Sequence, residues 1–204
     1  MPKEHKVIIV QGLGRDASKL VWITRFWKKY GLNPIVYSVG WHDTEEGFVP
    51  KLNRLLDLID KLFEEGDIVS LIGTSAGGSA VINAFAKRKQ QIASVVNICG
   101  RLRVGTHKGI HSFEIRTASS PAFAESVRMC EQEIEQLSSD DKDRIMTVRP
   151  LLGDELVPAD TVIINGAHNV VIPSGEHVLS IALSLSLLSA EMISFLVKSG
   201  AESG

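Results

Sequence analysis

The chain has 204 residues, of which 44% are hydrophobic and 23% are charged, and it carries 22 Lys+Arg against 24 Asp+Glu. This is an ordinary globular composition, so we expect one domain over residues 1–204 and exclude collagen-like, coiled-coil and disordered classes. The net charge of −2 lacks the basic excess typical of nucleic-acid-binding proteins, and no nucleic-acid partner is expected.

Cysteine usage and apolar segments bear on the compartment. Two cysteines, Cys99 and Cys130, make neither a disulfide framework nor a zinc knuckle, which favours a reducing, cytoplasmic setting. The apolar run 7–10 is too short for a signal peptide. The apolar stretch 178–197 is long enough to raise the question of a membrane span, but it contains Glu191 and five serines. We expect it to be a buried core helix and predict no integral membrane segment.

Short apolar runs alternate with amphipathic stretches along the whole chain. Strands are predicted over residues 6–11, 34–39, 67–73, 92–99, 144–148 and 169–173. Helices are predicted over 17–30, with Asp16 as N-cap and Gly31 as stop, and over 50–65, 76–88, 122–137 and 178–197.

This alternation predicts the α/β class, as a three-layer αβα sandwich around a mostly parallel six-stranded sheet. Residues 100–120 are weakly periodic, and the region 100–143 is expected to form a small cap or insert. In such sheets ligands bind beyond the carboxyl ends of the strands, so the residues that follow each strand are the candidates for a site.

The third predicted strand runs into Gly73-Thr74-Ser75-Ala76-Gly77, followed by Gly78. This is the G-x-S-x-G pattern of a nucleophile elbow, in the required context of a strand before it and a helix after it. A turn this sharp needs small neighbours around the serine. It predicts Ser75 as a nucleophile and the N–H of Ala76 as a donor to a developing oxyanion.

The first predicted strand is followed by Gly12-Leu13-Gly14-Arg15-Asp16-Ala17. One interpretation is a dinucleotide fingerprint, which requires an acidic residue at the end of the second strand, and residues 32–39 contain none. The other is an oxyanion loop, with the Leu13 N–H as second donor and Gly12 allowing close approach to Ser75. We favour the oxyanion loop.

An acid and a histidine follow the last two predicted strands. Asp154 is our choice for the acid, with Glu155 and Asp160 as alternatives. His177 follows the last strand, whereas His168 precedes it and would lie at the opposite edge of a parallel sheet, so we choose His177. The order serine, acid, histidine is that of the α/β-hydrolase type.

These residues carry a resemblance to the α/β-hydrolase fold, in a compact form without the first two strands. The elbow, the Asp154-Glu155-Leu156-Val157 loop and residues 165–177, similar to the end of small bacterial lipases and esterases, support it. Two positions depart from the pattern: Gln11 stands where the oxyanion loop often has histidine, and Glu176 replaces the glycine before the catalytic histidine. The resemblance implies a minimal α/β-hydrolase fold and a serine esterase.

The expected chemistry is hydrolysis of a small or medium carboxylic ester through an acyl-enzyme, with no metal or organic cofactor. Gly12, Trp41 and Arg101 are predicted to contact the substrate, and Glu176 to raise the pKa of His177 if its carboxylate turns inward. Thioester, lactone and amide hydrolysis with the same residues remain open, as does a non-catalytic binding protein of this fold. A small-molecule ester or thioester is the expected partner, and a homodimer is left open.

Overall fold

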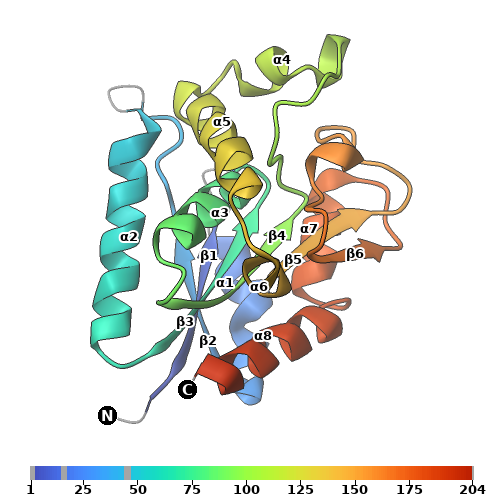
Figure 1. The fold of residues 1–204 in the computed structure, drawn as a ribbon. Coiled ribbons are helices and arrows are strands. Elements are labelled where there is room, and N and C mark those ends of the chain that lie inside the picture. Colours follow the sequence, from blue (N-terminus) through green and yellow to red (C-terminus); the bar gives the residue numbers. More distant parts are fainter. Residues whose placement is uncertain (1–2, 15–17, 44–46, 204) are drawn as a thin grey trace.

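The computed structural model describes residues 3–14, 18–43 and 47–203, and its centre is a six-stranded sheet (Figure 1). The strand order is β2-β1-β3-β4-β5-β6, and all five neighbouring pairs are parallel. The strands are β1 (His5–Val10), β2 (Leu32–Tyr37), β3 (Ile68–Thr74), β4 (Ile92–Ile98), β5 (Ile145–Pro150) and β6 (His168–Ile172).

Helices cover both faces of this sheet. One face packs against α2 (Phe48–Glu64), α3 (Gly77–Lys87) and α5 (Pro121–Glu135). The other packs against α1 (Ser18–Thr24), the 3₁₀ helix η1 (Arg25–Tyr30), α7 (His177–Leu185) and α8 (Ala190–Ser203). The predicted three-layer sandwich is confirmed, and the sheet is parallel throughout rather than mostly so.

The central strands are apolar at consecutive positions because both of their faces are buried. In β1, Ile8 and Val10 belong to the core under α2, α3 and α5, whereas Val7 and Ile9 belong to the core under α1, α7 and α8. All four side chains have no exposed surface. Successive side chains of a strand point to opposite faces, so an uninterrupted Val/Ile run is what a doubly covered strand requires.

The region between β4 and β5 rises above the carboxyl ends of the strands before it returns through α5 (Figure 1). Ser120 caps α5 by accepting a hydrogen bond from the Phe123 N–H, and Pro121 opens the helix. The remaining short helices are η2 (Gly109–His111), α4 (Phe113–Thr117), α6 (Ser139–Asp143) and, after β5, η3 (Ala159–Thr161).

The predicted helix over 178–197 is in fact two helices, α7 and α8, which meet at 54°. Ser186 leaves the helical conformation, with φ −125° and ψ −98°. Its hydroxyl donates to the Ala182 carbonyl and the Ser189 hydroxyl donates to the Ser186 carbonyl, a competition with backbone hydrogen bonds that bends helices. Among the described residues no single helix meets the length and hydropathy needed to span a bilayer; the bent α7–α8 pair meets them only jointly.

The predicted helix over 17–30 also changes character along its length. It is α-helical to Thr24 and 3₁₀ from Arg25 to Tyr30, and Gly31 ends it with φ +79°. A left-handed residue after a helix favours glycine, so the predicted stop is confirmed. Asp16, the predicted cap, and Ala17 lie outside the described residues.

Candidate active site

Ser75 occupies a strained turn between β3 and α3. Its φ is +53°, a left-handed conformation that costs a non-glycine residue about 1–3 kcal/mol and that clusters at functional sites. The turn is held by the Ser75 N–H, which donates to the Ile98 carbonyl at 3.0 Å, and by the Ser75 carbonyl, which accepts from the Gly78 N–H at 2.9 Å. The hydroxyl is thereby presented at the carboxyl edge of the sheet.

Three glycines make this turn sterically feasible. A Cβ at Gly73 would overlap the carbonyl of Gly77, and a Cβ at Gly77 would overlap the carbonyl of Val10. A Cβ at Gly78 would overlap the side-chain oxygen of Asn97. All three obstacles are buried, and two of them are backbone atoms, so the prediction that the elbow needs small neighbours is confirmed in its geometry.

The structure brings the three predicted triad side chains into one hydrogen-bonded chain. His177 Nε2 lies 2.9 Å from Ser75 Oγ, and His177 Nδ1 lies 2.7 Å from Asp154 Oδ2. The side chains of His177 and Asp154 are each only 3% exposed. The other Asp154 oxygen accepts the N–H groups of Leu156 and Val157 at 2.8 and 2.9 Å, which fixes the carboxylate plane toward the histidine.

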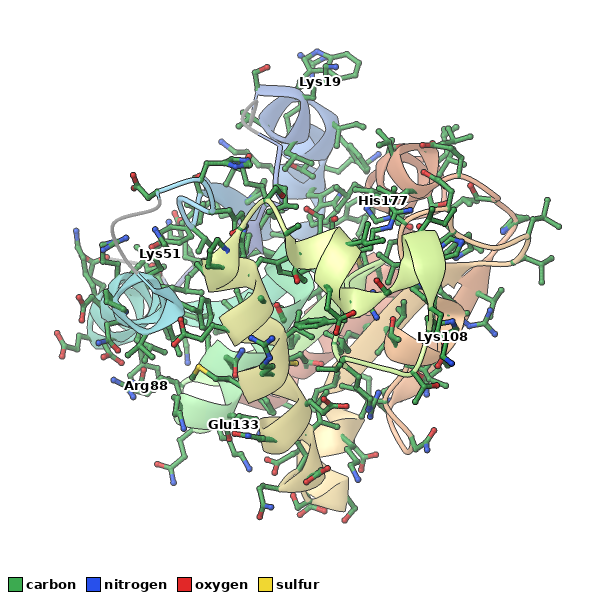
Figure 2. The ribbon with its side chains drawn as sticks, turned by 90° about the horizontal axis from the view of Figure 1, so that it is seen from above. Lys19, Lys51, Arg88, Lys108, Glu133 and His177 are labelled. Carbon is green, nitrogen blue, oxygen red and sulfur yellow. The ribbon has the colours of Figure 1, made fainter. Side chains whose placement is uncertain are left out.

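His168 lies at the opposite end of β6 from His177. It is the first residue of that strand, it pairs with Met146 in a parallel register, and its ring contacts Phe195 of α8 at 5.2 Å between centroids. His177 begins the helix that follows β6, and Figure 2, which views the sheet from its carboxyl edge, labels it there. The direction of the strand therefore separates the two histidines as predicted.

The loop after β1 lies directly against the serine. A Cβ at Gly12 would lie 2.7 Å from Ser75 Cβ and 3.2 Å from Ser75 Oγ, so only glycine allows this approach. The loop is anchored from behind, because His42 Nε2 lies 2.7 Å from the Leu13 carbonyl oxygen. Gly12 and the start of α3 at Ala76 thus lie next to Ser75, and the oxyanion roles of the Leu13 and Ala76 N–H groups stay predictions.

Solved structures share this architecture over almost the whole chain, although no family model and no curated protein matches the sequence. A structure described under "LipS and LipT, two metagenome-derived lipolytic enzymes" superposes with a TM-score of 0.66 at 13% identity, covering 96% of this chain and 94% of its own. The chain has the α/β-hydrolase fold. Est1E from Butyrivibrio proteoclasticus superposes with a TM-score of 0.65 at 16% identity, covering 98% of this chain and 89% of its own. The thioesterase domain from the curacin biosynthetic pathway superposes with a TM-score of 0.62 at 11% identity, covering 97% of this chain and 92% of its own.

Trp41, a predicted substrate contact, follows β2 and borders this α/β-hydrolase site from within the core. It is 4% exposed, its Nε1 donates to the Gln11 carbonyl at 3.0 Å, and its ring stacks on Phe48 at 5.9 Å. It also lines a depression of about 290 Å³ beside the loop after β1. The depression is formed by Leu13, Gly14, Ser38, Gly40, Trp41, His42 and Asp43.

Arg101 takes a structural position instead of the predicted substrate contact. It is 1% exposed, and its guanidinium donates to the carbonyl oxygens of Arg103, Val104 and His111. It also lies over the Phe113 ring at 5.6 Å. The expectation is corrected: the buried side chain connects the backbone of the segment after β4 and is not exposed to a substrate.

Two glutamates, Glu176 and Glu155, accept hydrogen bonds from backbone N–H groups at the start of α7. The Glu176 carboxylate accepts the N–H groups of Leu179 and Val178 at 2.5 and 3.1 Å, which lowers the pKa of its carboxyl. The inward turn on which an effect of Glu176 on His177 depended is therefore not made, and Glu176 is the N-cap of the helix. Glu155 accepts the backbone N–H of His177 at 3.1 Å, a contact that sequence reasoning missed.

The two cysteines and the grouping of potential metal ligands bear on whether the site uses a thiol or a metal ion. Both cysteines are buried and free, and burial raises the pKa of the Cys99 and Cys130 thiols, so they stay protonated. Within residues 3–14, 18–43 and 47–203, no three His, Cys, Asp or Glu side chains are grouped in a way that could bind a metal ion.

Proposed function

We propose that the protein is a serine hydrolase that cleaves carboxylic esters of small or medium acyl substrates. The observation that carries the proposal is the buried hydrogen-bond chain from Ser75 through His177 to Asp154, set on a left-handed turn. A serine that merely lies near a histidine at the surface requires neither a buried acid behind the histidine nor a left-handed backbone turn. A nucleophile, a base within 3 Å and an acid that orients the base together match acyl-transfer chemistry.

In the proposed reaction His177 acts as general base and then as general acid. Its Nδ1–H donates to Asp154, which leaves Nε2 unprotonated and facing Ser75 Oγ. As Oγ attacks the ester carbonyl, Nε2 takes the proton, and the ionised Asp154 stabilises the imidazolium. Nε2 then returns the proton to the alkoxide leaving group, and a water molecule repeats the cycle to release the acid from Ser75.

The negative charge of the tetrahedral intermediate is assigned to two backbone donors. The Ala76 N–H lies at the start of α3, where the helix dipole also favours an anion, and the Leu13 N–H lies on the loop that Gly12 brings against Ser75. Each such donor typically contributes about 2.7–4 kcal/mol to the transition state.

Esters are favoured over other acyl compounds by the structural neighbours, since two of them are described as lipolytic enzymes and as a monoacylglycerol lipase. The same mechanism acts on thioesters, and the neighbour described as a thioesterase domain makes that the second candidate. The two differ in the leaving group and not in the acyl-enzyme, so substrate competition separates them.

The test is hydrolysis of p-nitrophenyl acetate, butyrate and octanoate by the wild type and by Ser75→Ala, with acyl-CoA thioesters of the same chain lengths in parallel. The proposal expects ester turnover that Ser75→Ala loses and a higher kcat/KM for esters than for thioesters. A higher kcat/KM for thioesters assigns the thioesterase function. Equal turnover in wild type and Ser75→Ala contradicts both.

A further inference from the structure

The outer side of α1 and η1 carries alternating aromatic and cationic side chains. The Arg25 guanidinium lies over the Trp22 ring at 5.0 Å from its centroid, and Lys29 Nζ lies over the rings of Phe26 and Tyr30 at 5.6 and 4.9 Å. Their spacing of three and four residues places them on one face of the helical segment. We call these five residues the aromatic–cationic ladder.

Four of the five ladder residues are exposed, and Phe26 is partly buried against the core. Trp22 is 65% exposed, whereas the other two tryptophans, Trp27 and Trp41, are 0% and 4% exposed. Tyr30 is 46% exposed. Large aromatic side chains at the surface of a globular domain mark interaction sites when they are grouped, as they are here.

The segment that carries the ladder is cationic. Residues 17–42 contain Lys19, Arg25, Lys28 and Lys29 and no Asp or Glu, although the whole chain has a net charge of −2. Figure 2 labels Lys19 at the outer rim of α1. This cationic segment, on an otherwise slightly acidic protein, is complementary to an anionic partner, and the described acid beside it is Glu4, which lies near Lys28.

Aliphatic surface continues from the ladder toward α8. Beside η1, an apolar hollow of about 630 Å³ is lined by Phe26, Tyr30, Leu187, Ile193 and Val197, together with small residues and serines of the α7–α8 turn. Leu187 is 84% exposed. Aliphatic side chains contribute little to nucleic-acid binding, whereas aromatic, aliphatic and cationic groups together are what a protein presents to a lipid interface.

We propose that the aromatic–cationic ladder docks this protein on a bilayer that contains anionic lipids. Trp22 and Tyr30 take the headgroup level, where their rings are amphipathic, and the cations of residues 17–42 contact lipid phosphates. The apolar hollow faces the acyl region. This docking uses neither Ser75 nor His177, so it stands or falls independently of the proposed hydrolase activity.

The position of α1 in the fold determines how far the ladder lies from Ser75. α1 contacts α7, and α7 begins at His177. The next two residues, Val178 and Leu179, are 66% and 51% exposed. The Trp22 end of the ladder therefore lies nearer the carboxyl edge of the sheet, where Ser75 is, than Tyr30, which directly precedes β2.

The test measures binding of the full chain to phosphatidylcholine vesicles with and without phosphatidylglycerol, by co-sedimentation and by tryptophan emission. We expect binding only with phosphatidylglycerol, weakening with salt, and a blue shift of the emission, because Trp22 is the exposed indole. Trp22→Phe should remove the shift. Lys19→Gln with Arg25→Gln should lower partitioning about 25-fold, at about fivefold per cation near the surface.

The matched control is Lys61→Gln with Lys87→Gln, which removes the same charge from exposed lysines of α2 and α3 on the opposite face. It should bind vesicles like the wild type. Equal losses in the two double variants, no dependence on phosphatidylglycerol, or an unchanged shift in Trp22→Phe would each overturn the proposal. So would single-stranded DNA binding that displaces the vesicles, or a dimer that Trp22→Ala dissociates without any vesicle binding.

Discussion

Replacing Asp154 by asparagine should reverse the tautomer of His177. One Asp154 oxygen accepts two backbone N–H groups, at 2.8 and 2.9 Å, and the other accepts from His177 Nδ1 at 2.7 Å. An asparagine at this position must place its carbonyl toward the two N–H donors, so its NH₂ group faces Nδ1. Nδ1 then accepts, Nε2 carries the proton, and it donates to Ser75 Oγ instead of taking its proton.

The expected loss of kcat in Asp154→Asn is large because His177 no longer acts as a base, although the fold is retained. Loss of the correct tautomer lowers kcat about 10⁴-fold, or about 5 kcal/mol, in a triad of this kind. The asparagine is isosteric and keeps the two backbone hydrogen bonds, so the melting temperature should change little. KM should also change little, because Asp154 lies behind His177 and not on the substrate side.

The assay is p-nitrophenyl butyrate hydrolysis by Asp154→Asn, with the two neighbouring acids as controls. Glu155 accepts only the backbone N–H of His177, and Asp160 is 63% exposed and lies 2.7 Å from His107, so Glu155→Gln and Asp160→Asn should retain most activity. If Asp154→Asn stays within tenfold of wild type, or if either control loses more, the role assigned to Asp154 is refuted.

Three further predictions concern stability. Gly77→Ala should lower the free energy of unfolding by at least the 1–3 kcal/mol typical of overpacking, because its Cβ overlaps the Val10 carbonyl; Gly14→Ala, with nothing within 4 Å, is the control in thermal melts. Glu176→Ala should melt lower at neutral pH, and because hydrogen bonding lowers the pKa of the Glu176 carboxyl, the difference from wild type should shrink as pH falls below 4.5; a constant difference would argue against the cap. Burial lowers the pKa of His5 to about 4, so the free energy of unfolding of the wild type should not depend on His5 above pH 6.5 and should fall between pH 6.5 and pH 4. His5→Gln should flatten this part of the plot of unfolding free energy against pH. An unchanged slope in His5→Gln would exclude His5 as the source of the pH dependence.

The sequence predicted the parts of the site that depend on chain direction. Parallel strands put every following residue at one edge, so Ser75, Asp154 and His177 converge and His168 does not. The elbow was predictable because a turn with φ +53° at a serine requires glycines at fixed offsets. These are local constraints with long-range consequences, and one sequence suffices to see them.

The sequence did not predict features that depend on tertiary competition. Nothing in 178–197 is a glycine or proline, so the break at Ser186 arises from serine hydroxyls competing for helix carbonyls. The capping role of Glu176 was not predicted because Glu is an uncommon N-cap and the direction of its side chain depends on where the helix begins. Arg101 was predicted at the substrate because a basic residue is normally exposed. Only the fold shows that three backbone carbonyl oxygens accept its guanidinium N–H groups in the interior.

The most direct test of the proposed activity is covalent labelling by a fluorophosphonate probe, with the modified peptide mapped by mass spectrometry. We predict modification of Ser75, its loss in Ser75→Ala and His177→Ala, and near wild-type labelling in His168→Ala. Modification of another serine, such as the fully buried Ser79, or undiminished labelling in His177→Ala would contradict the account.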